Sequence, residues 1–95
     1  MKNGTQIIYV PYHIDIDNIY HEDTEFGFVY DDREIKDTDF IFCRYWSKIY
    51  SEELRTKSCG EATPIHRLVV QNTRDQQLIW EEIRKIKEEY DYTKL

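Results

Sequence analysis

Basic and aromatic residues in the middle of the chain are the strongest candidates for chemistry. Guanidinium groups bind phosphates through paired hydrogen bonds, hydroxyls add donors, and a Trp or Tyr ring stacks on a base. This combination predicts a site for a small phosphorylated nucleotide. The alternative is a solvated basic face with structural cation–π packing. The candidates are Arg44, Tyr45, Trp46, Lys48, Arg55, Thr56, Lys57, Ser58 and Arg67; we expect Arg44, Trp46, Arg55, Thr56, Lys57 and Ser58 to bind ligand.

A second group combines histidines with carboxylates, which are ligands for zinc, manganese or iron. Its members are His13, Asp15, Asp17, His21, Glu22 and Asp23. Their spacing matches no metal signature, and the run beginning at Asp15 lacks the glycine and terminal glutamate of a calcium loop. The pattern therefore favours a solvated polar face, and we predict no metal site.

The two cysteines raise the question of nucleophilic catalysis with His66. Cys59 lies near Arg55 and Lys57, which could lower a thiol pKa. The sequence shows no residue that would orient the histidine and no group of donors that would form an oxyanion hole. Cys43 alternates onto one strand face with Ile41 and Tyr45, where it is typical of a small buried apolar residue. We predict two free thiols and no enzymatic activity.

The net charge of -6 is unevenly distributed along the 95 residues. Ten acids stand against two bases in residues 13–39, whereas residues 40–74 carry an excess of three bases. An acidic chain with a pI near 5.0 argues against a general DNA or RNA binder and disfavours sequence-specific RNA recognition by exposed aromatic residues. The acidic segment supports an alternative function, a protein inhibitor that imitates a nucleic-acid backbone and blocks a basic groove on a host enzyme.

Short β-branched and aromatic runs predict most of the fold. We expect strands at 5–12, 25–30, 40–46 and 68–70, and a short strand at 54–57. Residues 13–17 are expected to be extended, either continuing the first strand or forming a second one, and a turn or single 3₁₀ turn is expected at 63–65. Gly27 within the second run indicates a bulge or a close backbone approach. One domain, residues 1–95, with a β-rich core at about 5–70, is expected. The predicted class is α+β, a small antiparallel SH3-like barrel or curled sheet followed by one C-terminal helix.

The C-terminal segment predicts a helix over residues 73–91. Thr73 is the expected N-cap, with Gln76 completing a capping box. A narrow apolar seam runs along this helix, and it either packs on the barrel or pairs with a second copy of the chain. The second possibility makes a homo-oligomer with an interface at Ile79, Ile83, Ile86 and Tyr90.

The expected compartment is the cytoplasm. No run approaches the roughly 20 apolar residues that cross a bilayer, and the first residues lead into no secretory leader.

Four segments precede the predicted helix and form a pattern with it: FCRYWS at 42–47, ELRTKS at 53–58, EATPI at 61–65 and LV at 68–69. This pattern resembles one in short phage-encoded proteins, among them the Thoeris anti-defence sponges, which sequester cyclic ADP-ribose signals made by bacterial immune TIR enzymes. The resemblance implies a β-rich core, assembly through the helix, and ligand pockets near a subunit interface without catalysis. Arg44, Arg55 and Thr56 match best. Ser58-Cys59 departs from the pattern, and residues before Phe40 have no counterpart.

The leading functional prediction is therefore a small phage or mobile-element protein in the host cytoplasm. It is expected to bind an anionic nucleotide signal, a cyclic ADP-ribose-like molecule or a cyclic nucleotide, without turning it over. No cofactor is expected. The acidic inhibitor of a host defence enzyme is the alternative.

Overall fold

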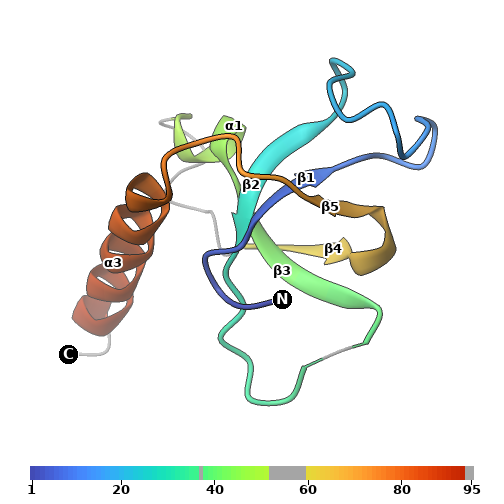
Figure 1. Cartoon of the computed structure of the whole chain (residues 1–95). Coiled ribbons are helices and arrows are strands. Elements are labelled where there is room, and N and C mark those ends of the chain that lie inside the picture. The colour runs from blue at the N-terminus through green and yellow to red at the C-terminus, as the bar shows by residue number, and fades with distance from the viewer. Residues whose placement is uncertain (37, 52–59, 94–95) are drawn as a thin grey trace.

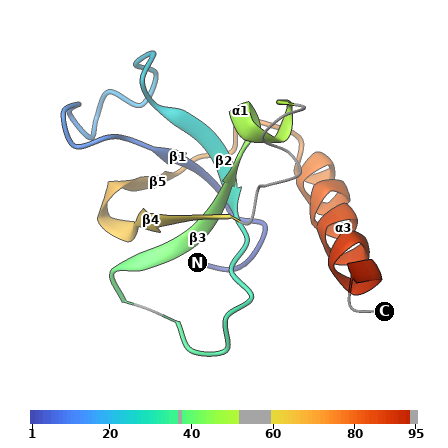
Figure 2. The ribbon, with the colours of Figure 1, turned by 180° about the vertical axis from the view of Figure 1, so that it is seen from behind.

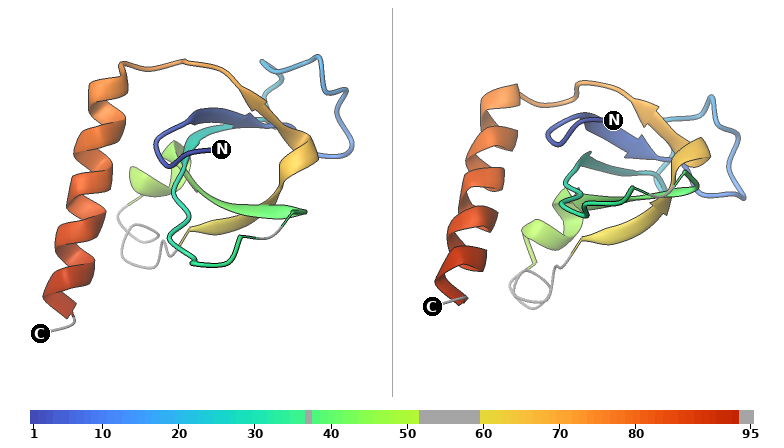
Figure 3. Two further views of the ribbon diagram at one scale, coloured as in Figure 1. Left: turned by 60° about the horizontal axis from the view of Figure 1, so that its bottom comes forward. Right: turned by 90° about the horizontal axis from the view of Figure 1, so that it is seen from below.

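Five antiparallel strands form a single curled sheet in the computed structural model, which describes residues 1–36, 38–51 and 60–93, with side chains up to residue 88. The strand order is β4-β3-β2-β1-β5, which places the first strand between the second and the last. The sheet curls into a half-barrel, and a single long helix stands beside it (Figures 1 and 3). The α+β prediction of a small curled antiparallel sheet with a C-terminal helix is confirmed. The elements are β1 (Gln6–Tyr9), β2 (Glu25–Val29), β3 (Phe40–Tyr45), α1 (Trp46–Ile49), β4 (Glu61–Pro64), the 3₁₀ turn η1 (Ile65–Arg67), β5 (Leu68–Val70) and α3 (Gln76–Thr93).

The predicted strand at 13–17 is wrong, because this segment belongs to a chain of turns between β1 and β2. Successive backbone hydrogen bonds close these turns, the first from Ile14 N to the Pro11 carbonyl. The Asp15 side chain accepts a hydrogen bond from Asp17 N, which further favours a turn over an extended backbone. The apolar alternation still directs Ile14 inward, where it packs with Ile8 and Val10.

The chain after β3 also departs from the prediction. Trp46 does not extend the strand but begins the short helix α1. Residues 61–64 form β4, paired with β3 in the register Ile41↔Thr63, so the predicted turn at 63–65 begins two residues later, as η1. The predicted strand at 54–57 lies outside the described residues.

Gly27 permits a close approach between β2 and β3, as its place in the sequence predicts. A Cβ atom at this position would lie 2.1 Å from the carbonyl oxygen of Arg44. This oxygen belongs to the backbone and has little freedom to move, so a larger residue would separate the two strands.

Alternating side chains of the sheet build two cores, and the β1–β2 loop adds a third cluster around Ile8, Val10 and Ile14. Ile7, Val29 and Ile41 fill the barrel interior together with Cys43 and Tyr45. The opposite face of the sheet carries Phe28, which packs with Trp46, Ile49, Ile79 and Ile83. The helix and α1 therefore cover the outer face, whereas the barrel interior closes on itself.

The apolar seam of α3 packs within the molecule. Ile79 is fully buried and Ile83 is 6% exposed, and Ile86 packs half-buried against the same outer core. These three isoleucines are therefore core residues of a single chain and do not form a free interface for a second copy. The side chain of Tyr90 lies outside the described side chains.

The predicted N-cap at Thr73 is wrong, because α3 begins at Gln76 and the Asp75 carboxylate accepts a hydrogen bond from Gln77 N. A side chain from β1 explains the shift. The buried amide of Gln6 accepts hydrogen bonds from the backbone N–H groups of Thr73 and Arg74, at 3.1 and 2.9 Å. It also donates to the Arg74 carbonyl at 2.8 Å and to the Gln76 side chain at 3.1 Å. Gln6 thus holds this backbone outside the helix.

We predict that Gln6→Leu lowers the free energy of unfolding by about 3 kcal/mol, because it leaves three backbone polar groups without their buried partner. Gln77→Leu, on an exposed helix position, is the matched control and should change stability by about 0.5 kcal/mol or less. Urea unfolding followed by circular dichroism measures both. Equal stability of the two variants would contradict the assigned role of Gln6.

Candidate functional site

Trp46, predicted to stack on a base, is a core residue. It is only 5% exposed. Its ring packs on Phe28 with centroids 5.5 Å apart and stacks on Tyr50 at 5.7 Å with 23° between the planes. The physical reason is that Trp46 lies on the outer face, where Ile49 of α1 and the isoleucines of α3 pack against it. A ligand base would have to displace these contacts to reach the ring.

Arg44 lies half-buried on the same outer face, where its guanidinium stands 5.7 Å from the ring centroid of Tyr30. Tyr45 points to the opposite face and is 3% exposed, with its hydroxyl 2.8 Å from Thr63 Oγ1. Burial raises the pKa of the Tyr45 hydroxyl well above its ordinary value. The structure therefore separates Arg44 and Tyr45 onto two faces of the sheet, as strand alternation requires.

Two of the remaining candidate cations have structural partners. The Lys48 ammonium pairs with the Glu61 carboxylate. The Arg67 guanidinium donates to the carbonyl oxygens of Val10, Pro11 and Ile14 at 2.8, 2.8 and 2.5 Å, and it lies 5.5 Å from the ring centroid of Tyr12. Arg67 thus anchors the start of the β1–β2 loop. The candidates Arg55, Thr56, Lys57 and Ser58 lie outside the described residues.

One arginine contact was missed by the sequence analysis. The Arg74 guanidinium lies 4.5 Å from the ring centroid of Trp46 and 5.5 Å from that of Tyr50. Its Nη1 atom donates to the Tyr50 hydroxyl at 3.0 Å. Arg74 and Tyr50 are both exposed, so this cluster of side chains is open to solvent on one side. No spacing in the sequence signals a contact between residues so far apart along the chain.

The thiol of Cys43 is unsuited to catalysis. Cys43 is fully buried in the barrel interior, as predicted, and burial raises its pKa to about 11. His66 is exposed, with Nε2 at 2.9 Å from the Tyr12 hydroxyl. Thiol and imidazole therefore lack the hydrogen bond that activates a cysteine nucleophile. Cys59 lies outside the described residues.

The histidine and carboxylate group is only partly assembled. His13 Nε2 lies 3.1 Å from the Asp23 carboxylate, and His21 Nδ1 accepts a hydrogen bond from the backbone N–H of Asp23. Among the residues that the structure describes, no three histidine, cysteine or acidic side chains are grouped so that they could hold a metal ion.

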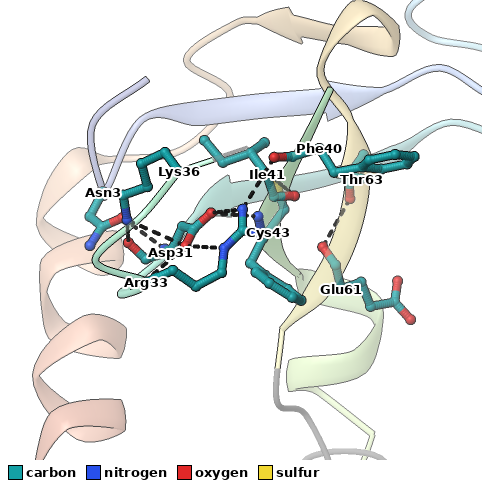
Figure 4. A network of polar contacts seen from close by, with 10 residues as sticks. Asn3, Asp31, Arg33, Lys36, Phe40, Ile41, Cys43, Glu61 and Thr63 are labelled. Carbon is teal, nitrogen blue, oxygen red and sulfur yellow. Dashed lines mark hydrogen bonds and ion pairs between the residues drawn. The ribbon is translucent and has the colours of Figure 1, made fainter. Parts of the chain in front are cut away.

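The acidic segment 13–39 is divided between the two ends of the barrel. At the end opposite the β1–β2 loop, Asp31 is buried and accepts hydrogen bonds from the Arg33 guanidinium at 2.6 and 2.9 Å and from Phe42 N at 3.2 Å. The Lys36 ammonium adds an ion pair at 3.3 Å (Figure 4). These contacts, first among them the Arg33 bonds, hold the pKa of Asp31 well below its usual range. Both bases of the segment are thereby engaged with one acid.

The end of the barrel that carries the β1–β2 loop gathers six carboxylates, and we call it the acidic end. In Figure 2 the loop and α3 project from opposite sides of the barrel. Glu61 joins the loop acids because β4 begins at this end, so the structure adds one acid from the basic middle of the sequence. The six residues are Asp15, Asp17, Glu22, Asp23, Glu25 and Glu61.

A pocket of about 290 Å³ opens at the acidic end, and we call it the barrel-mouth pocket. It lies where β1 and β3 end and β2 and β4 begin. Tyr9 and Tyr45 both line it, and their ring centroids lie 6.4 Å apart with the ring planes tilted by 58°. The full lining is Tyr9, Pro11, Asp23, Glu25, Tyr45, Glu61, Ala62, Thr63 and Pro64.

Comparison of this chain with protein-family models, with curated proteins and with solved structures finds no match. None of the helices in the described part of the chain combines the length and the apolar character needed to cross a membrane.

We predict that Asp31 makes the protein acid-sensitive. Because its pKa is lowered in the folded state, its stabilising contribution is complete above the ordinary carboxyl pKa, about 3.9, and is lost as pH falls below it. Asp31→Asn should therefore lower the free energy of unfolding at pH 7 by about 3 kcal/mol. The difference in free energy of unfolding between Asp31→Asn and wild type should narrow towards pH 3.

Urea unfolding at a series of pH values tests this prediction. Asp32→Asn, at the exposed neighbouring acid, is the matched control and should keep the wild-type pH profile. A profile for Asp31→Asn that runs parallel to wild type between pH 7 and pH 3 would show that the buried carboxylate is not the source of the acid sensitivity.

Proposed function

We propose that this protein is a non-catalytic binding module whose acidic end docks on a basic surface of another protein. The observation that carries the proposal is the unequal use of charge. Lys48, Arg67, Arg33 and Lys36 have intramolecular partners, whereas the loop acids Asp15, Asp17 and Glu22 are exposed.

Such a surface attracts a positively charged groove over long range and raises the association rate, with strong dependence on salt. A groove that normally holds a nucleic-acid backbone has the complementary charge. Docking there would exclude the nucleic acid and inhibit the partner, a host defence enzyme in the inhibitor hypothesis. The high pKa of the Cys43 thiol and the engagement of His66 with Tyr12 support binding without catalysis.

We expect the immobilised protein to retain a basic nucleic-acid-binding protein from a lysate of its host at about 50 mM salt and to release it near 500 mM. Double-stranded DNA should compete for the retained protein. With the purified partner, Asp15→Asn/Asp17→Asn/Glu22→Gln should raise the dissociation constant by about tenfold or more.

The matched control neutralises three exposed acids elsewhere, Asp32→Asn/Glu34→Gln/Glu88→Gln, and should leave the dissociation constant within about twofold. Retention of no basic protein at low salt, or equal weakening by the two triple variants, would refute docking by the acidic end.

A second candidate function, sequestration of an anionic nucleotide signal by a phage anti-defence protein, is favoured by the Arg74 contact. Arg74 and the Tyr50 ring offer an exposed guanidinium beside an aromatic surface. Residues 55–58, which resemble the sponge pattern, follow Tyr50 closely in the sequence. In this hypothesis Trp46 supports the Tyr50 ring and does not itself stack on the base. Arg44 lies on the same outer face of the sheet as Trp46.

Thermal-shift screening with cyclic ADP-ribose isomers and cyclic oligonucleotides tests the second function. A ligand at 100 times its dissociation constant should add about 2.7 kcal/mol of stability. Arg74→Gln and Arg55→Ala should each abolish the shift, and Arg84→Ala, on the exposed face of α3, should preserve it. Heating the complex should return intact ligand; a cleaved product would instead identify an enzyme.

A further inference from the structure

The barrel-mouth pocket differs from the rest of the acidic end because it combines negative charge with a shaped, partly apolar interior. Its rim carries Asp23, Glu25 and Glu61, which come from a loop and two different strands. Two tyrosines and two prolines also line it, Tyr9, Tyr45, Pro11 and Pro64. Carboxylates around aromatic faces favour an organic cation, because both the charge and the ring quadrupole attract it.

Hydrogen bonds and ion pairs orient several side chains that line the pocket. The Tyr45 hydroxyl is held by Thr63 Oγ1, which in turn lies 3.1 Å from the Glu61 carbonyl oxygen as a donor. The carboxylates are also oriented: Asp23 Oδ2 faces His13, Glu25 Oε2 accepts from Ser47 Oγ at 3.3 Å, and Glu61 Oε1 faces Lys48. Each of these contacts uses one oxygen of a carboxylate that has two.

The pocket volume decides the size of the occupant. At about 290 Å³ the pocket stands at the lower limit of small-molecule sites, which span roughly 300–1,000 Å³. This space suits one long side chain better than a nucleotide, and the acidic rim would repel phosphates. Arginine is the cationic side chain that interfaces most often use as a buried anchor, and its planar fork matches carboxylates.

We infer that the barrel-mouth pocket receives an arginine side chain from the basic partner. The inference rests on the proposed docking of the acidic end and gives that docking its specificity: the loop acids attract the partner, and the pocket selects a surface that presents an arginine. The guanidinium lies between the rim carboxylates, and its methylene stem lies along the two tyrosines.

NMR titration of the isotope-labelled full chain with N-acetyl-arginine amide tests the pocket without any knowledge of the partner. We expect saturable chemical-shift changes at Tyr9, Tyr45 and Ala62. N-acetyl-citrulline amide, which has the same shape without the charge, should produce none. Glu25→Gln/Glu61→Gln should raise the dissociation constant of the arginine probe by about tenfold. Asp15→Asn/Asp17→Asn, which removes the same charge from the loop, should leave that constant within about twofold of wild type.

Shifts of equal size with citrulline, or an arginine response unchanged in Glu25→Gln/Glu61→Gln, would overturn the inference. This failure is distinct from failure of the proposed docking, because retention of a basic protein and its loss in the loop triple variant are measured independently. A partner that binds through the loop acids while the pocket ignores arginine would leave docking in place and remove only the arginine anchor.

Discussion

The buried amide of Gln6 is the interaction on which the rest of the structure depends. Its oxygen and nitrogen make four hydrogen bonds, and three of them go to the backbone of the connection between β5 and α3. A buried amide satisfied at every position is stabilising, but the same amide without partners would be costly. The connection can therefore take only one course, and that course sets where α3 begins and which face of the sheet it covers.

Several consequences follow from the placement of α3. Ile79 and Ile83 become core residues against Phe28, and the same packing buries Trp46. Arg74, fixed through its own backbone by Gln6, is brought over the Trp46 and Tyr50 rings. The helical seam and the tryptophan thus serve folding, whereas the acidic end lies on the opposite side of the barrel from α3.

Charge is divided in the same way between folding and exposed surface. Arg33 and Lys36 neutralise the buried Asp31, and Arg67 fastens the β1–β2 loop through three carbonyl oxygens. The loop that Arg67 fastens carries exposed acids. Structural use of a cation therefore helps to create the anionic surface, and an acidic chain with a basic middle in its sequence becomes a molecule with an acidic end.

The sequence by itself determined the elements whose cause is local. Alternating aromatic residues predicted β2, β3 and the burial of Cys43, a β-branched run predicted β5, the 3–4 spacing of isoleucines predicted α3, and Gly27 marked a close strand approach. Only the tertiary structure decided the start of α3, the burial of Trp46, the anchoring of residues 10–14 and the meeting of Glu61 with Asp23 and Glu25. Each of these depends on a partner distant along the chain, such as Gln6 for residue 74 or Arg67 for residues 10–14. Side-chain periodicity predicts which way a residue points, but it does not show which remote group the side chain will contact. That contact decides whether an arginine is available to bind a ligand or instead stabilises the fold.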